Sequence, residues 1–259
     1  MSFVGKKFKN AYGSFLNTNA DNNGISISEK AIKDGLGTSS SCTIGKDTLK
    51  VRPSADSTEA FSVKDKDGNN LFKVDSSNNK VLTGVSQVYS NTMYKEFGVY
   101  DLDPTLNVYY PLPCNTTWEN NDAFEADDDI MGTGPATSLD ISSVGGFGAE
   151  VLIASIWYLP DNITIDSAKA FGTASGHDLG CKIFSYDIVS SSGATGGDLS
   201  NGTELCTGNI PTTNNALNIA TLTVSSANVT AGKVILAMIR NETGTNNFTA
   251  RIQIKYHIQ

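Results

Sequence analysis

The densest group of side chains that could do chemistry is the acidic run FEADDDI, which contains Asp127, Asp128 and Asp129. Hard cations such as Ca²⁺ bind several carboxylate and carbonyl oxygens, so these three aspartates are candidate metal ligands. The run lacks the spaced ligands and the fixed glycine of an EF-hand loop. A solvated acidic loop is the simpler interpretation of such a charge run.

Catalytic side chains are sparse. Only two histidines occur, His177 in the turn-rich stretch SGHDLG and His257 in the last apolar segment, and we interpret both as structural. No nucleophile elbow, zinc-protease motif or phosphate loop is present. Two distant carboxylates among 27 acidic residues could still serve a glycosidase, which keeps a polysaccharide depolymerase as a lesser alternative. We expect a protein that is not an enzyme and needs no cofactor.

One aromatic residue stands in a markedly polar context. Trp118 lies within CNTTWENND. An exposed ring in a polar loop is a platform on which a sugar can stack, although packing in a core is the commoner role. Trp118 is therefore the candidate receptor-binding residue.

The composition indicates an all-β protein, so strands and the loops between them must position these side chains. The 259 residues include 39% hydrophobic residues, enough for one large β-domain or two smaller units. Gly, Ser, Thr and Asn are abundant between short runs of Val, Ile and Phe. No run approaches 18 apolar residues and no signal peptide is apparent, so we expect neither membrane insertion nor export.

Charge is distributed unevenly along the chain. Residues 1–95 hold 13 Lys and Arg against 9 Asp and Glu, whereas residues 96–259 hold 6 against 18, which together give the net charge of −8. The two parts therefore face different partners, and the acidic part is approached more easily by a basic or neutral receptor surface. The first part has no dense basic patch, so we expect no nucleic-acid partner.

The four cysteines, Cys42, Cys114, Cys181 and Cys206, fit neither a zinc pattern nor a redox pair, because 72, 67 and 25 residues separate them. Buried free thiols in a protein made in a reducing cytosol are the simpler interpretation. A disulfide between Cys181 and Cys206 stays open.

Residues 61–82, FSVKDKDGNNLFKVDSSNNKVL, contain the same short phrase twice. Phe61 and Val63, and again Phe72 and Val74, stand two residues apart, so each pair points to one face of a short strand. A hairpin of this size is marginal in water and its apolar face must be covered, either by the large domain or by copies of the same chain about a symmetry axis. The few apolar residues per unit favour the second solution and predict an oligomer interface at these four residues.

The longer second part predicts an antiparallel β-sandwich of jelly-roll type. In its last strand Ile252, Ile254 and Tyr256 share one face, and Arg251, Gln253 and Lys255 share the other. Residues 85–98 are interpreted as a connector in which a short helix is one option. Eight strands are expected, at residues 106–110, 137–142, 149–158, 163–171, 180–189, 217–224, 233–240 and 248–258.

The segments NNGISISEKAIKDGLGTSSSCTIGKDTLKV and AFSVKDKDGNNLFKVDSSNNKVL resemble the N-terminal part of tailed-bacteriophage fibre and appendage proteins, over about residues 20–84. In that group an attachment segment leads into small strand repeats and a distal β-sandwich. The resemblance implies a homotrimer whose N-terminus is fixed to capsid or tail, with reduced cysteines and no signal peptide. It carries over no site residues.

The organisation expected from these observations has three parts. Residues 1–45 attach the protein to other virion proteins, residues 46–98 form a short β-repeat neck, and residues 99–259 form a sandwich head. Exposed loops of the head, such as 115–136 and 190–216, would bind a host-surface glycan or protein. The alternative is a capsid decoration protein that stabilises the virion head with the same trimer.

Overall fold

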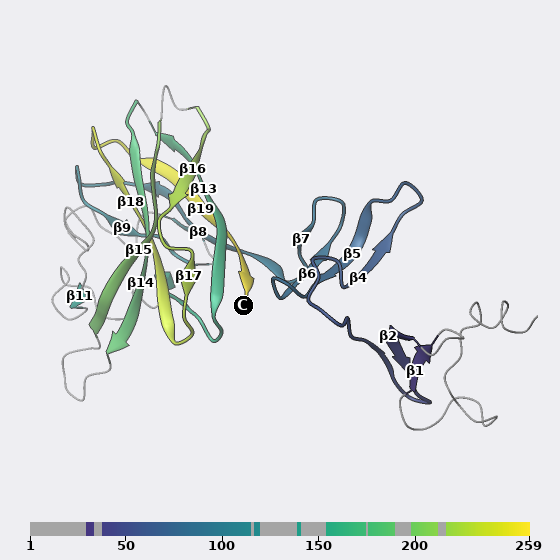
Figure 1. Cartoon of the computed structure of the whole chain (residues 1–259). Coiled ribbons are helices and arrows are strands. Elements are labelled where there is room, and N and C mark those ends of the chain that lie inside the picture. The colour runs from purple at the N-terminus through teal and green to yellow at the C-terminus, as the bar shows by residue number, and fades with distance from the viewer. Residues whose placement is uncertain are drawn as a thin grey trace, which may run out of the picture. The chain divides into compact units, whose positions relative to one another are not determined.

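The computed structural model describes residues 30–33, 38–114, 117–119, 139–140, 154–174, 176–189, 198–211 and 216–259. Over these residues the chain is nearly all β-strand, arranged in three sheets (Figure 1). The predicted all-β class is confirmed. The chain divides into two compact units, Met1–Ser90 and Asn91–Gln259. None of the described residues form a helix with the length and apolar character needed to cross a membrane.

The first unit contains two small antiparallel sheets. One sheet has the order β1-β2-β3 and the other, the neck sheet, has the order β4-β5-β6-β7 (Figure 1). Their strands are β1 (Lys30–Lys33), β2 (Ser39–Ile44), β3 (Leu49–Val51), β4 (Phe61–Lys64), β5 (Asn70–Asp75), β6 (Lys80–Thr83) and β7 (Val88–Tyr89). The neck sheet is thus a meander in which each strand pairs with the next in sequence.

Each repeat of the neck sheet ends in a turn that an aspartate holds. The Asp65 carboxylate accepts hydrogen bonds from the backbone and side-chain N–H groups of Asn69, both at 2.9 Å. The Asp75 carboxylate accepts the equivalent pair from Asn78, at 3.0 and 2.9 Å. Asn79 then takes the left-handed conformation, with φ of 54°, which asparagine tolerates better than most residues. Short polar side chains therefore fix the register of strands that have little else to hold them.

The second unit is built on one large sheet that curls on itself. Its strand order is β10-β8-β19-β13-β16-β15-β14-β18-β12, with β11, β17 and β9 paired to β15, β13 and β18. All pairings are antiparallel except that of β10 with β8. The strands are β8 (Thr92–Leu102), β9 (Tyr110–Pro111), β10 (Thr117–Glu119), β11 (Leu139–Asp140), β12 (Trp157–Tyr158), β13 (Ile163–Ala174), β14 (Leu179–Val189), β15 (Asp198–Ile210), β16 (Asn218–Val224), β17 (Asn228–Val229), β18 (Lys233–Asn241) and β19 (Phe248–Ile258).

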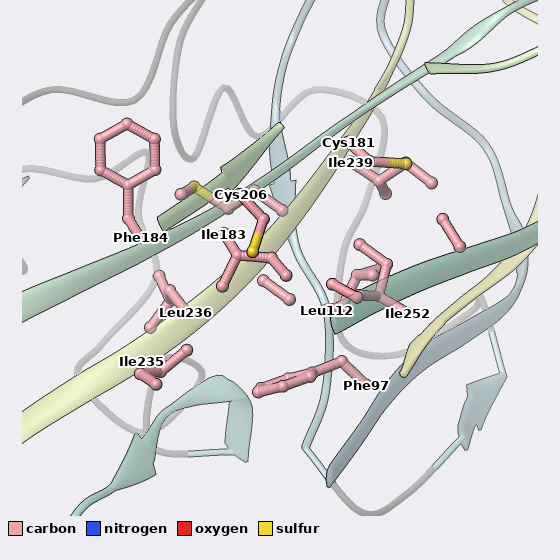
Figure 2. Close-up of a cluster of buried hydrophobic side chains, with 14 of the residues drawn as sticks. Phe97, Leu112, Cys181, Ile183, Phe184, Cys206, Ile235, Leu236, Ile239 and Ile252 are labelled. Carbon is pink, nitrogen blue, oxygen red and sulfur yellow. The ribbon is translucent and has the colours of Figure 1, made fainter. Parts of the chain in front are cut away.

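Strand β16 joins the two halves of this sheet. Residues 218–222 pair with β13, and the last two residues pair with β15. Both halves supply one hydrophobic core: Phe97 and Ile252 come from β8 and β19, and Ile183 and Ile235 come from β14 and β18 (Figure 2). The core lies entirely in the second unit.

The alternation predicted for the last strand is confirmed. In β19 the side chains of Ile252, Ile254 and Tyr256 are buried, while Arg251 is exposed and Gln253 and Lys255 are half-buried. β18 behaves differently, because residues 234–239 are all buried. Successive side chains of a strand point to opposite faces, so β18 is covered on both.

Five of the predicted strands agree with the structure apart from their ends, namely those at 163–171, 180–189, 217–224, 233–240 and 248–258. The strand expected at 106–110 is shorter and shifted to Tyr110–Pro111. Of the strands expected at 137–142 and 149–158, the described strand residues are 139–140 and 157–158. The chain turns through Asn107, with φ of 62°, before β9 begins.

The short helix considered for residues 85–98 is wrong. This segment contains β7 and most of β8, and β8 is paired along its length with β19 at the other end of the chain. The loop expected at 190–216 is also wrong in part, because residues 198–210 form β15, a central strand between β14 and β16. Its sequence, DLSNGTELCTGNI, is rich in turn formers, and only its neighbours make it a strand.

Candidate functional site

The four residues predicted to form an oligomer interface lie on one face of the neck sheet. Phe61 of β4 is directly opposite Val74 of β5, and Val63 is opposite Phe72. Directly opposed residues of antiparallel strands point to the same side, so the four form one patch. The rings of Phe61 and Phe72 meet edge to face, with centroids 6.1 Å apart.

Two further valines extend this patch. Val81 of β6 is opposite Val74, and Val88 of β7 lies in the row that contains Thr83 and Phe72. We call the surface of these six apolar residues the neck face; its members are Phe61, Val63, Phe72, Val74, Val81 and Val88. The sequence did not predict Val81 and Val88 as members of the oligomer interface. Val81 and Thr83 are two residues apart and therefore share a face of β6, which is the signal that could have identified Val81.

The neck face is apolar but poorly covered. Phe61 and Val63 keep 42% and 45% of their surface exposed, and Phe72 and Val74 are half-buried. A hollow of about 320 Å³ continues the apolar surface, with Leu49, Val51 and Pro53 among the residues that line it beside Phe61. Contiguous exposed apolar surface is typical of an interaction site.

The opposite face of the neck sheet has a different character. Leu82 is buried, and the ammonium of Lys80 lies 5.4 Å from the centre of the Tyr89 ring. Lys73 stands on the same side, opposite Leu82. Long polar side chains therefore flank Leu82 and Tyr89 on this face, while Leu71, on the same face of β5, stays 47% exposed.

The turns of the neck sheet depend on ionised aspartates. The Asn69 side chain and backbone hold the pKa of Asp65 below its usual range, because they donate hydrogen bonds to the charged form. The Asn78 side chain does the same for the pKa of Asp75. The geometry that presents the neck face thus includes two carboxylates that favour the charged state.

The other predicted site residues are only partly within the described chain. Asp127, Asp128 and Asp129 lie outside the described residues, and the residues that are described include no cluster of His, Cys, Asp and Glu suited to a metal ion. Trp118 belongs to β10, where its backbone is opposite Val99 of β8, but its side chain is not described.

The histidines have polar neighbours. His257 Nδ1 lies 2.9 Å from Asp166 Oδ1, at the bulge of β13, and His177 Nε2 lies 2.9 Å from the Asn246 amide nitrogen. Both rings are therefore positioned by neighbouring polar side chains.

All four cysteines are free thiols, so the disulfide left open between Cys181 and Cys206 is not formed. Cys206 of β15 lies opposite Ile183 of β14, and Ile183 is two residues from Cys181 on β14. Burial raises the pKa of Cys206 to about 12 and raises that of Cys181 well above its usual range. These thiols are inert core residues under neutral conditions.

No protein-family model matches the sequence, and a search of curated proteins found no significant match. The functional proposal therefore rests on the residues of the chain and on their arrangement.

Proposed function

We propose that this chain is a bacteriophage virion structural protein, a trimeric fibre or fibre-like appendage rather than an enzyme. The observation that carries the proposal is the neck face, six apolar side chains on a sheet of four short strands. A sheet this small is marginal alone, and its apolar face gains stability only when water is excluded from it. When three copies pack about one axis, each copy covers the neck face of another, and no further element is needed.

In this proposal the second unit is the head, a jelly-roll-like β-sandwich. The curled sheet supports this reading, since β16 passes from one half to the other and the core is supplied by both halves. Residues 1–45 attach the trimer to capsid or tail proteins, residues 46–90 form the neck, and residues 91–259, which include β8, bind the host surface. The protein functions on the virion, which is assembled in the host cytoplasm.

The trimer is tested by light scattering of the full-length protein and two matched variants. Val63 and Leu71 are exposed to 45% and 47%, but Val63 is on the neck face and Leu71 is on the other face of β5. The wild type is expected at three times the chain mass. Val63→Asp would place three carboxylates at the shared axis, at a cost of several kcal/mol per buried charge, and is expected to give monomers. Leu71→Asp is expected to remain a trimer.

A monomeric wild type would overturn the proposal, as would equal behaviour of the two variants. Attachment to host cells is tested separately, by adding excess full-length protein before phage. Blocked adsorption supports the fibre. If adsorption is unchanged and capsids lacking the protein burst more readily under heat, the trimer is a capsid decoration protein instead.

A further inference from the structure

The outer face of the second unit carries a strip of basic, amide and aromatic side chains along β19. Gln253 lies between Glu96 of β8 and Lys169 of β13, and the neighbouring rows carry Lys255 with Tyr94, and Arg251 with Phe171. We call this surface the basic strip; its members are Tyr94, Lys169, Phe171, Arg251, Gln253 and Lys255. Arg251 and Lys255 are four residues apart on β19, a distance of roughly 14 Å along an extended strand, and Lys169 lies beside Gln253 between them.

The positive charge of this strip is unusual for its surroundings. Residues 91–259 hold only 7 Lys and Arg against 18 Asp and Glu, yet three of the seven lie on the strip. Elsewhere in the unit three cations are neutralised by a carboxylate: Lys182 by Glu204, Lys233 by Asp187 and Arg240 by Glu242.

On the strip itself only Arg251 is paired in this way, with Glu96. Lys169 and Lys255 form no ion pair with any described residue. The strip therefore holds two cations whose charge is not neutralised by a neighbouring carboxylate of the described chain.

The polar groups at the centre of the strip are held in place. Arg251 Nη1 donates to Glu96 Oε2 at 3.2 Å, and Gln253 Nε2 donates to Glu96 Oε1 at 2.8 Å. Arg251 also lies over Gly98, where a Cβ atom would be 3.5 Å from its Nε. A guanidinium, a carboxylate and an amide thus form a fixed row of planar hydrogen-bonding groups, which lowers the entropy lost when a ligand binds.

One end of the strip opens into an apolar groove. The groove has a volume of about 330 Å³, and its lining includes Val99, Phe171, Thr173, Leu217 and Arg251. Leu217 is 73% exposed beside it. The other end of the strip carries Tyr94, which is 59% exposed. Apolar and aromatic surface at both ends suits the C–H faces of sugar rings, and the polar row between suits their hydroxyl and carboxylate groups.

We infer that the basic strip binds an acidic oligosaccharide of the host cell surface, with Lys169 and Lys255 facing its carboxylates. The inference rests on the proposed host attachment and narrows its ligand class. The total charge of the second part favoured a basic or neutral receptor. At physiological salt, however, charges are screened within about 8 Å, so the ligand experiences the cations of the strip more than any acidic residue beyond that distance.

Binding is tested with full-length protein by biolayer interferometry on immobilised polygalacturonate, with dextran of similar length as the neutral surface and single-stranded DNA as a second polyanion. Polygalacturonate is expected to bind, dextran to bind at least tenfold more weakly, and the polygalacturonate signal to fall as salt increases. Equal binding to dextran, or DNA binding as strong as that of polygalacturonate, would overturn the assignment.

Variants connect binding to the strip. Lys169→Ala with Lys255→Ala is expected to weaken polygalacturonate binding about fivefold to tenfold, and Phe171→Ala to weaken it without changing the salt dependence. Lys66→Ala removes one exposed charge from the first unit and is the control. Unchanged thermal unfolding shows that each variant is folded. If the double variant binds like wild type, or the control weakens binding equally, the inference is wrong.

The strip and the proposed function fail in distinguishable ways. Protein that blocks phage adsorption equally well with or without the double substitution attaches to hosts through another surface, which contradicts the strip alone. Protein that binds polygalacturonate through the strip but neither trimerises nor affects adsorption contradicts the fibre proposal and leaves the saccharide site standing.

Discussion

The two units of this chain are both built from β-strands, but they differ in how much apolar surface each can bury. The second unit holds the entire hydrophobic core cluster, whereas the only buried hydrophobic residue in the described part of the first unit is Leu82. The neck sheet has six apolar side chains on one face, and no second layer formed by the described residues buries them. The difference teaches that a sheet is stable by itself only when its chain also supplies its cover.

The largest expected effect separates Phe97 in the core of the second unit from Phe61 on the neck face. Phe97 is 1% exposed and Phe61 is 42% exposed. Phe97→Ala is expected to lower the free energy of unfolding of the second unit by about 3–5 kcal/mol, because it removes a large buried side chain and leaves a cavity. Phe61→Ala is expected to leave this transition unchanged and to weaken self-association. Urea unfolding followed by tryptophan fluorescence measures the first effect.

The comparison between the units fails if both phenylalanine variants destabilise the second unit equally. Light scattering over a dilution series of Phe61→Ala provides the complementary measurement. Trimers of Phe61→Ala are expected to dissociate at a higher protein concentration than trimers of the wild type. Trimers of Phe97→Ala are not expected to show this change.

Thiol reactivity gives the next largest contrast. Burial raises the pKa of Cys206 to about 12, so at pH 8 its reactive thiolate is roughly a thousandfold rarer than that of an ordinary cysteine. Cys181 is buried as well, while Cys42 of the first unit is half-exposed. Maleimide labelling followed by peptide mass spectrometry is expected to modify Cys42 early and Cys181 and Cys206 only after unfolding. Early labelling of Cys206 in the native protein would contradict the closed core.

The smallest expected effect concerns the turns of the neck sheet. The pKa of Asp75 is lower in the folded state, so its stabilising contribution is present above the ordinary pKa of about 3.9 and is lost as pH falls through the lowered value. Hydrogen exchange of peptides from residues 61–82, corrected for intrinsic rates, is expected to accelerate between pH 5 and pH 3. Asp75→Asn should exchange faster at pH 5 and respond less to acid.

Asp67→Asn is the control for this measurement, since it removes the same charge from the neck sheet but only an exposed contact with Lys66. A pH response of Asp75→Asn identical to that of wild type would show that the Asp75 turn does not stabilise the sheet.

Strands with a clear periodic pattern could be predicted from sequence. Ile252, Ile254 and Tyr256 alternate with polar residues, and β19 has the expected face. β8 was missed because Met93 and Tyr94, and later Phe97 and Val99, do not alternate cleanly with polar residues. β15 was missed because its Asn, Gly and Thr residues favour turns. β8 is a strand because β19, distant in sequence, offers it a backbone partner, and β15 is a strand because it lies between β14 and β16 and pairs with both.

The candidate sites follow the same division. Phe61, Val63, Phe72 and Val74 could be predicted to share a face because a period of two needs no tertiary information. The basic strip could not be predicted, because Lys169 and Arg251 are 82 residues apart and come together only through the register of β13 and β19.

The sequence by itself determined the all-β class, the shared face of Phe61, Val63, Phe72 and Val74, and the alternation of β19, because these depend on local backbone preference and on side-chain period. Only the tertiary structure decided that Val81 and Val88 extend the neck face, that β8 and β15 are strands, and that three cations lie side by side in an acidic unit. Strand pairing joins residues far apart in the chain, and their register is set by the packing of the whole sheet rather than by any short stretch of sequence.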